Sequence, residues 1–278
     1  MKKINRRSFL AAAGLTAAAL ALTASGGSAS STASSTASSA ASSEAASTSA
    51  AAELTTVEAG KLTMATNATF PPYEMTTDSG EIEGIDVDTA KAIAEKLGLE
   101  LQIDDMDFDA ALLSVQQGKA DIVMAGVTVT DERKAVMDFS DSYATGIQSI
   151  IVPEGSDITS PDDLAGKKIG TQRGTTGYIY CSDDFGDDAV VAYDDGLTAV
   201  QALKNGQVDA VVIDNAPAKE YVAANPGLVI LDTSYAEEDY AIGMAKGSAL
   251  EDAVNAALEE LKADGTLQSI VDKYITAE

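Results

Sequence analysis

The sequence predicts an α/β fold in which short strands alternate with helices in two similar halves. Three observations lead to this prediction. Short apolar runs typical of buried strands recur along the chain, helix-like spacing of apolar residues follows most of them, and two such series resemble each other. Strands that alternate with helices form largely parallel sheets covered by helices. The prediction concerns residues 57–278, because the preceding residues have a different character.

In the first series of elements, glycine residues mark the ends of the predicted helices. Apolar residues at helical spacing predict a helix that Gly98 ends, and Asp107 can cap a second helix that Gly118 ends. An apolar run directly after this second helix is typical of a strand buried on both faces. The expected elements are strands at 61–66, 99–103 and 120–125 and helices at 86–97 and 108–117.

The second series begins at Ser160, which is followed by Pro161 and two acidic residues, a pattern typical of a helix start. Helical stretches separate the strands that follow, and two more helices close the chain. The expected strands are at 168–171, 189–193, 210–213 and 228–231, and the closing helices are at 249–263 and 266–274.

The two series repeat each other at one spacing. A Gly-x-x-Asp segment precedes a buried strand in both, so that Gly126 and Asp214 occupy equivalent places just past a strand. Duplication predicts two similar lobes, and chance similarity of two βαβ units is the alternative. Ligands of open α/β sheets bind at the carboxyl ends of strands. This rule places Asn67, residues 126–128, residues 172–176 and Asp214 in a cleft.

The first 27 residues carry signals for export. Four basic residues within positions 1–7 precede an apolar run at 9–24, which is shorter than the roughly 20 residues of a membrane-spanning helix. Arg6 and Arg7 resemble a twin-arginine signal, and a general secretory signal fits equally well.

Residues 28–56 are expected to form a disordered tether. From position 28 to position 52 every residue is Ser, Ala or Thr except Glu44, so no apolar face is available for packing. The segment before it is close to a lipoprotein cleavage site, but Ser25 stands where the lipid-bearing Cys would be needed. An export signal followed by a tether predicts a domain in the periplasm or at the cell surface, held at the outer face of the cytoplasmic membrane in its natural form.

The composition excludes several classes of function. The chain has no His and one Cys, so neither a Cys/His metal site nor a His-dependent nucleophile can be built, and no metal or cofactor is expected. Residues 57–278 carry 14 basic and 42 acidic residues, a net charge of −28 that repels nucleic acid. Cys181 has no partner for a disulfide and is expected to be a small buried residue. A monomer is expected.

The residues near the predicted cleft combine three kinds of chemistry. Arg133 can grip a carboxylate through two parallel hydrogen bonds, and the hydroxyls and free N–H groups at Thr175 and Thr176 favour an anion. Asp214 can accept from an ammonium group. Phe70 and Phe108 can form apolar walls. Each residue alone has an ordinary structural use, but together they fit an amino-acid zwitterion. The candidate ligand-binding residues are Asn67, Phe70, Phe108, Gly126, Thr128, Arg133, Gln172, Thr175, Thr176 and Asp214.

Seven segments in order make the chain similar to a known family. It resembles the family 3 extracellular or periplasmic solute-binding proteins that serve polar amino-acid ABC transporters, over about residues 61–274. The segments are Phe70-Pro71-Pro72-Tyr73-Glu74, Gly84-Ile85-Asp86-Val87-Asp88, Gly118-Lys119-Ala120-Asp121, Thr130-Asp131-Glu132-Arg133, Asp138-Phe139-Ser140-Asp141-Ser142-Tyr143, Gly174-Thr175-Thr176 and Val208-Asp209-Ala210-Val211-Val212-Ile213-Asp214.

The resemblance implies a type II periplasmic-binding-protein fold of two lobes joined by two crossings. The crossings are expected near 146–151 and near 240–243, which divides the chain into lobe 1 at 57–146 plus 242–278 and lobe 2 at 147–241.

The resemblance also implies roles for site residues. Arg133 would hold the ligand carboxylate with help from Thr128 and Thr176. Asp214 and the carbonyl at Gly126 would take the α-ammonium group, and the two Phe residues would flank the side chain.

By resemblance the chain is a receptor that captures a polar L-amino acid between closing lobes and delivers it to the permease of an ABC importer. It is not expected to be an enzyme. A dehydratase that uses the same cleft, with Glu74 as a further acid, and an extracellular sensor are the alternatives. Asn67 carries no charge where many binders of cationic amino acids have an acid. It therefore favours a neutral polar side chain, glutamine-like or cystine-like, over arginine or lysine, with glutamate and aspartate last. The alternative is that the faces of Phe70 and Phe108, together with a nearby acid such as Glu74 or Asp107, favour a cationic side chain.

Overall fold

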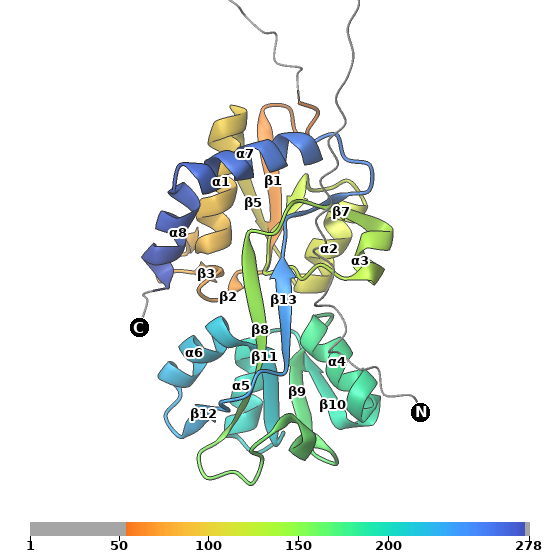
Figure 1. Ribbon diagram of the computed structural model, residues 1–278, viewed down its shortest axis with the longest axis vertical. Helices are drawn as coiled ribbons and strands as arrows, with labels where there is room; N and C mark the ends of the chain where they lie inside the picture. The colour runs from red at the N-terminus through yellow and green to blue at the C-terminus, as the bar shows by residue number, and fades with distance from the viewer. Residues whose placement is uncertain (1–53, 276–278) are drawn as a thin grey trace, which may run out of the picture. The chain divides into compact units, whose positions relative to one another are not determined.

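Two mixed β-sheets with helices packed on them form the framework of the protein (Figure 1). The computed structural model describes residues 54–275. The predicted export signal lies outside this range, as does all but the end of the predicted tether. Within residues 54–275, no helix has both the length and the apolar character needed to cross a bilayer.

The first sheet has the strand order β5-β1-β6-β14-β7. Strand β1 pairs in parallel with β5 and β6, whereas β14 returns from far along the chain and pairs antiparallel with β6 and β7. The strands are β1 (Lys61–Thr66), β5 (Glu100–Asp105), β6 (Ile122–Val123), β7 (Met137–Phe139) and β14 (Gly243–Ala245).

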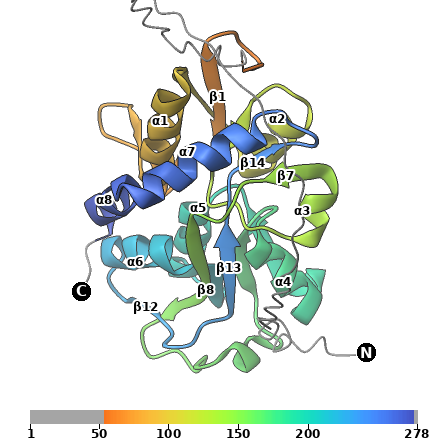
Figure 2. The same ribbon diagram turned by 45° about the horizontal axis from the view of Figure 1, so that its top comes forward.

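Five helices and a small hairpin sheet accompany the first sheet, and together we call them the first lobe. Helix α7 lies across α1, and α8 packs against both (Figure 2). The helices are α1 (Ile85–Leu97), α2 (Phe108–Gln116), α3 (Asp131–Val136), α7 (Glu251–Ala263) and α8 (Thr266–Tyr274). The hairpin sheet consists of β2 (Thr69–Phe70), β3 (Glu74–Thr76) and β4 (Ile82–Glu83).

The second sheet has the strand order β10-β9-β11-β8-β12, and β13 also pairs with β8. Strand β9 is parallel to β10 and β11, and every partner of β8 is antiparallel to it. The strands are β8 (Ala144–Pro153), β9 (Ile169–Gln172), β10 (Val190–Tyr193), β11 (Ala210–Asp214), β12 (Leu228–Ile230) and β13 (Ala236–Tyr240).

Three α-helices and two short 3₁₀ turns accompany the second sheet, and together we call them the second lobe. These elements are α4 (Thr176–Phe185), α5 (Gly196–Lys204), α6 (Asn215–Ala224), η1 (Pro161–Leu164) and η2 (Asp187–Ala189). Helices α4 and α5 both pack on β9 and β11, and α6 packs on β8 and β11, so that the strands lie in apolar surroundings.

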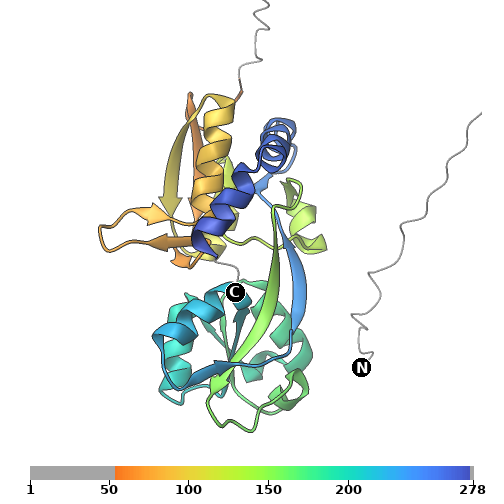
Figure 3. The same cartoon turned by 60° about the vertical axis from the view of Figure 1, so that its left-hand side comes forward.

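The long strands β8 and β13 run side by side from the second sheet toward the first lobe (Figure 3). Gly146 stands opposite Glu238 in this pair. A Cβ atom on Gly146 would lie 2.5 Å from the Tyr240 ring, so glycine leaves the space that the ring occupies. The lobe boundaries predicted at 146/147 and 241/242 fall within or just past these strands and stay a prediction.

The predicted elements agree with the structure in type and differ mainly at two places. Parallel pairing holds among β1, β5 and β6 and among β9, β10 and β11, whereas the predicted strand at 228–231, β12, pairs antiparallel with β8, and β7, β8, β13 and β14 also pair antiparallel, so both sheets are mixed. The strand expected at 120–125 is a ladder of two residues only, because Gly126 turns the chain at φ +54°. The helix expected after Ser160 is a four-residue 3₁₀ turn, where the Asp163 carboxylate accepts bonds from Thr159 and Ser160.

We predict that Gly84→Ala destabilises the fold strongly. Gly84 precedes α1 with φ +142°, and a Cβ atom there would lie 2.0 Å from the carbonyl oxygen of Tyr73. Backbone strain and overpacking together cost about 2–6 kcal/mol. Gly80→Ala is the control, since Gly80 also has positive φ but open space around it. Urea unfolding should show a much larger loss for Gly84→Ala, and equal losses would contradict the steric argument.

Candidate ligand-binding site

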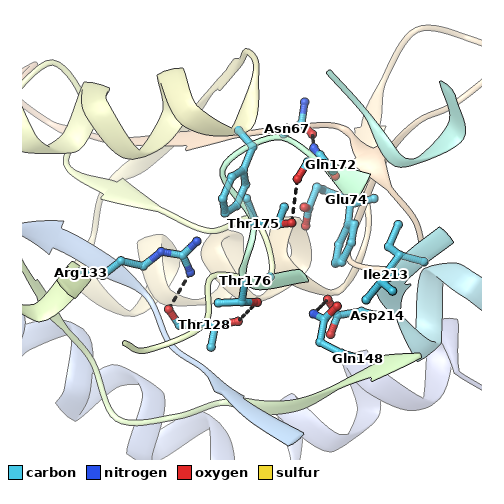
Figure 4. A pocket seen from close by; sticks show the side chains of 15 residues that line it. Asn67, Glu74, Thr128, Arg133, Gln148, Gln172, Thr175, Thr176, Ile213 and Asp214 are labelled. Carbon is cyan, nitrogen blue, oxygen red and sulfur yellow. Dashed lines mark hydrogen bonds between the residues drawn. The ribbon is translucent and has the colours of Figure 1, made fainter. Parts of the chain in front are cut away.

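One cavity between the lobes gathers all ten residues that the sequence selected (Figure 4). Its volume is about 430 Å³, part of it open to solvent. The lining residues are Asn67, Phe70, Glu74, Phe108, Ala125, Gly126, Thr128, Arg133, Gln148, Gln172, Thr175, Thr176, Val212, Ile213 and Asp214. The binding of a ligand by these residues stays a prediction. Because all ten residues lie around one cavity, the prediction now concerns a single place in the structure.

The topology explains why these residues meet. Asn67 follows β1, Gly126 comes shortly after β6, Gln172 ends β9 and Asp214 ends β11. These four strands present their carboxyl ends to the space between the sheets, as the strand-end rule requires. Side chains from distant parts of the sequence therefore converge without any local motif that joins them.

Arg133 is the one buried cation of the described residues that line the cavity. Thr130 caps α3 and accepts a hydrogen bond from the backbone N–H of Arg133, which fixes where the side chain starts. The guanidinium donates to the carbonyls of Thr128 at 2.8 Å and Gly174 at 3.1 Å. Its Cζ atom lies 5.4 Å from the centre of the Phe108 ring.

The guanidinium of Arg133 has donors beyond those that bond to the two carbonyls. Burial lowers the pKa of Arg133, and the nearby Glu238 carboxylate opposes that shift. The group stays charged at neutral pH, because arginine does not lose its proton in proteins. A guanidinium has five N–H donors, and the two carbonyls do not use them all, so a carboxylate can receive the rest.

Asp214 places a carboxylate in the same cavity. Its Oδ2 atom accepts a 2.7 Å hydrogen bond from the Gln148 side chain. Its Oδ1 atom is buried without a well-aligned partner among the described residues, although the Tyr240 hydroxyl is close enough to lower its pKa. Burial, together with the charge of Glu238, outweighs these effects and raises the pKa of Asp214 to about 7.

Glu74 is a second buried carboxyl group that lines the cavity. The side chain is fully buried, and neither oxygen has a well-formed hydrogen bond within residues 54–275. Burial and then the neighbouring Asp86 raise its pKa well above the usual range. Sequence reasoning considered Glu74 as an acid for an enzyme and as a charge for a cationic side chain but could not place it, because the burial of both oxygens cannot be read from the chain.

Asp86 lies behind Glu74 and supports the cavity wall. It accepts hydrogen bonds from the Gly126 backbone N–H at 2.9 Å and from the Tyr143 hydroxyl at 2.7 Å. Burial raises the pKa of Asp86 to about 6, and these two bonds limit the rise. The Asp86 side chain therefore fixes the backbone at Gly126, which lines the cavity.

The chain makes its own hydrogen bonds across the cavity and beside it. The Gln172 amide donates to the side-chain oxygen of Asn67 at 2.8 Å, and the Tyr221 hydroxyl donates to the carbonyl of Thr69 at 2.5 Å. Asn67 also donates to the carbonyl of Met106, so both ends of its amide already have partners. The bonds from Gln172 and from Tyr221 join the second lobe to the first.

Sequence reasoning missed three polar residues of this region. Gln148, Glu238 and Tyr240 lie in the strands β8 and β13, where they contact Asp214 or its neighbours. No spacing signal points to them, since each lies in a strand that leaves one lobe for the other. Within the described part of the chain, no group of three or more acidic, His or Cys side chains could hold a metal ion.

Comparison with known proteins gives consistent matches. The family model described as bacterial extracellular solute-binding proteins, family 3, matches residues 62–277. A probable histidine-binding protein of Neisseria gonorrhoeae is 33% identical, over 99% of this chain and 98% of its own. The arginine-binding extracellular protein ArtP of Bacillus subtilis is 34% identical, over 78% of this chain and 87% of its own.

Solved structures give the same picture. An ancestral arginine-binding protein bound to glutamine is 44% identical, with a TM-score of 0.75 over 78% of this chain and 99% of that chain. Its arginine-bound form gives a TM-score of 0.74. The ancestral arginine-binding protein thus has the same fold as the 78% of this chain that the comparison covers.

We predict that the ligand-free protein becomes less stable as pH rises from about 4 to 7. The raised pKa values of Asp214, Asp86 and Glu74 mean that the folded state holds protons that the unfolded state releases in this range. The free energy of unfolding therefore falls with pH, by up to about 1.4 kcal/mol for each unit of pKa shift.

Thermal melting between pH 4.5 and 7.5 measures this slope. Asp214→Asn should reduce it, because the amide no longer titrates, whereas Glu259→Gln removes an exposed charge from α7 and should leave it unchanged. Equal slopes in the three proteins would contradict the assignment to Asp214.

Proposed function

Because the chain belongs to the family 3 bacterial extracellular solute-binding proteins, we propose that it binds a polar L-amino acid between its lobes and presents it to the permease of an ABC importer. Its relatives are amino-acid binding proteins of this kind, and the family works outside the cytoplasmic membrane. Attachment to the outer face of that membrane through the N-terminal segment is part of the proposal.

The observation that carries the proposal is one cavity with opposite charges for the two ends of a zwitterion. Arg133 has donors left for an α-carboxylate, and Asp214 supplies a carboxylate for an α-ammonium group, with one oxygen that lacks a well-aligned partner among residues 54–275. Both side chains are buried, so water competes little with a ligand for them. Phe70 and Phe108 supply apolar area beside these groups.

Glu74 changes the order of ligands that Asn67 alone favoured. One N–H and the oxygen of the Asn67 amide already have partners, whereas neither oxygen of Glu74 has a well-formed hydrogen bond within the described residues, although the Asp86 carboxyl is close enough to raise its pKa. A carboxyl group in that position favours a side chain that ends in several N–H donors. A guanidinium would also supply the opposite charge, lower the pKa of Glu74 and ionise it. We therefore place arginine first and glutamine second.

The names of relatives agree with this range of ligands. Among them are proteins named for arginine and for histidine, and the ancestral arginine-binding protein has been solved with arginine and with glutamine. Those ligands belong to those proteins. For this chain they define the first compounds to test.

A screen of the common L-amino acids by thermal shift, followed by calorimetric titration, tests the proposed function. A ligand at a hundredfold excess over its Kd adds about 2.7 kcal/mol to stability. Absence of any shift would contradict the proposal. The family consists of transport receptors, and the absence of a reaction in this cleft is part of the proposal, tested by incubating the protein with cyclic dehydratase substrates and assaying product.

We predict that Arg133→Ala abolishes tight binding and keeps the fold. Removing the guanidinium leaves a ligand carboxylate buried without a partner, which costs roughly 3–5 kcal/mol, or about two to four decades in Kd. Lys134→Ala is the matched control, because Lys134 is the exposed cation next along α3. Calorimetry on variants with native circular dichroism gives the answer, and unchanged affinity in Arg133→Ala would reject this site.

We predict that Glu74→Gln weakens arginine binding far more than glutamine binding. A charge-assisted hydrogen bond contributes about 1.5–3 kcal/mol, so the Kd for arginine should rise about 10- to 150-fold. The Kd for glutamine should change little, because the new amide still offers an acceptor. Glu81→Gln removes an exposed charge from the same hairpin and should affect neither ligand. Equal losses of affinity for both amino acids would show that Glu74 does not distinguish the side chain of arginine from that of glutamine.

A further inference from the structure

Glu238 is a buried carboxylate in the strand that connects the lobes. It lies on β13 opposite Gly146, and its side chain is 7% exposed. A single oxygen, Oε2, receives hydrogen bonds from three side chains: Thr176 at 2.9 Å, Gln148 at 3.0 Å and Thr128 at 3.2 Å. Thr128 belongs to the first lobe and Thr176 to the second, so Glu238 contacts both sides of the cavity.

The three bonds determine which way the two hydroxyl groups point. A carboxylate only accepts hydrogen bonds, and a threonine hydroxyl has one proton to donate. The shorter bonds of the two hydroxyls go to Glu238, at 3.2 Å from Thr128 and 2.9 Å from Thr176, and a longer contact of 3.5 Å joins the hydroxyls to each other, so each proton is directed to Glu238 or to the other threonine. Each hydroxyl therefore offers only lone pairs to anything in the cavity that both residues line.

Gln148 extends this arrangement to Asp214. Its side-chain nitrogen has two hydrogens, and it donates to Asp214 at 2.7 Å and to Glu238 at 3.0 Å. The amide thus separates two carboxylates that repel each other, and it occupies one oxygen of each. The other oxygen of Asp214 stays without a well-aligned partner among the described residues.

The result is a set of acceptors on one side of the cavity: the hydroxyl oxygens of Thr128 and Thr176 and the carboxylate of Asp214. An ammonium group has three donors and no acceptor, so it matches this set. A carboxylate does not match it, since no proton is left for it there. The donors for a carboxylate come from Arg133.

We propose that Glu238 is a positioning residue of the site, which turns the hydroxyls of Thr128 and Thr176 into acceptors for the α-ammonium group of the ligand. This inference rests on the proposed function. It moves both threonines from the carboxylate of the ligand, where family resemblance placed them, to its ammonium group. Glu238 acts through the two hydroxyls, since it does not itself line the cavity.

Glu238→Gln tests the proposal, with Glu237→Gln as the control. The glutamine side chain can donate to a hydroxyl, so it releases at least one threonine proton toward the cavity. Glu237 is the exposed neighbour on the same strand, and its change removes an equal charge without touching the site.

The measurement compares each amino acid with its analogue that lacks the α-ammonium group. The pairs are L-arginine with 5-guanidinopentanoate and L-glutamine with glutaramate, the analogues being measured by competition. The Kd of the analogue divided by the Kd of its parent amino acid measures how much the ammonium group contributes to affinity. In Glu238→Gln the parent amino acid should lose about 10- to 100-fold in affinity while the analogue changes little, so that the ratio falls. In Glu237→Gln the ratio should equal that of the wild type.

A purely structural role for Glu238 would weaken parent and analogue equally and leave the ratio unchanged, and that result would overturn the proposal. Thr176→Val and Thr176→Ser give an independent test if Glu238→Gln does not fold. Valine should lower the ratio and serine should restore it, and an unchanged ratio with valine would also overturn the proposal. Failure of the wild-type protein to bind any amino acid would contradict the proposed function instead.

Discussion

The site depends on charged groups that the fold buries and leaves partly without partners. Arg133 uses some of its donors on backbone carbonyls, while Asp214 and Glu74 keep oxygens without well-formed bonds among the described residues. Burying such groups costs free energy, which the packing of both sheets must offset. A ligand with complementary charges relieves this cost. The groups proposed to bind the ligand are therefore also groups whose burial costs stability in the ligand-free fold.

The two strands between the lobes do more than connect them. Strand β8 supplies Gln148 and β13 supplies Glu238 and Tyr240, so the residues that orient Asp214 and the threonine hydroxyls lie in the segment that must bend when the lobes move. A change of the angle between the lobes therefore changes the hydrogen bonds around the charged groups. In the proposed receptor, closure of the lobes and the affinity of the site would be coupled through these two strands.

Sequence reasoning found the residues that follow strands and missed those that cross between lobes. The strand-end rule selected Asn67 and Asp214 from periodicity alone, because strand ends can be read from apolar runs. Gln148 and Glu238 lie within strands, where a polar residue looks like an exposed one until the partner strand is known. The state of Glu74 could not be read either, since a lack of partners depends on the packing of Asp86 and Tyr143 around it.

The hydrogen bonds from Gln172 to Asn67 and from Tyr221 to Thr69 have a consequence for kinetics. They join the lobes in the arrangement that the structure shows, whatever the cavity contains, and so add to the free energy with which a bound ligand would hold the lobes together. The same bonds must break before a ligand can leave, which lengthens its residence time. A receptor that must release its ligand to a permease can have only a limited number of such bonds. Each additional bond slows the release of the ligand and therefore lowers the rate of transport.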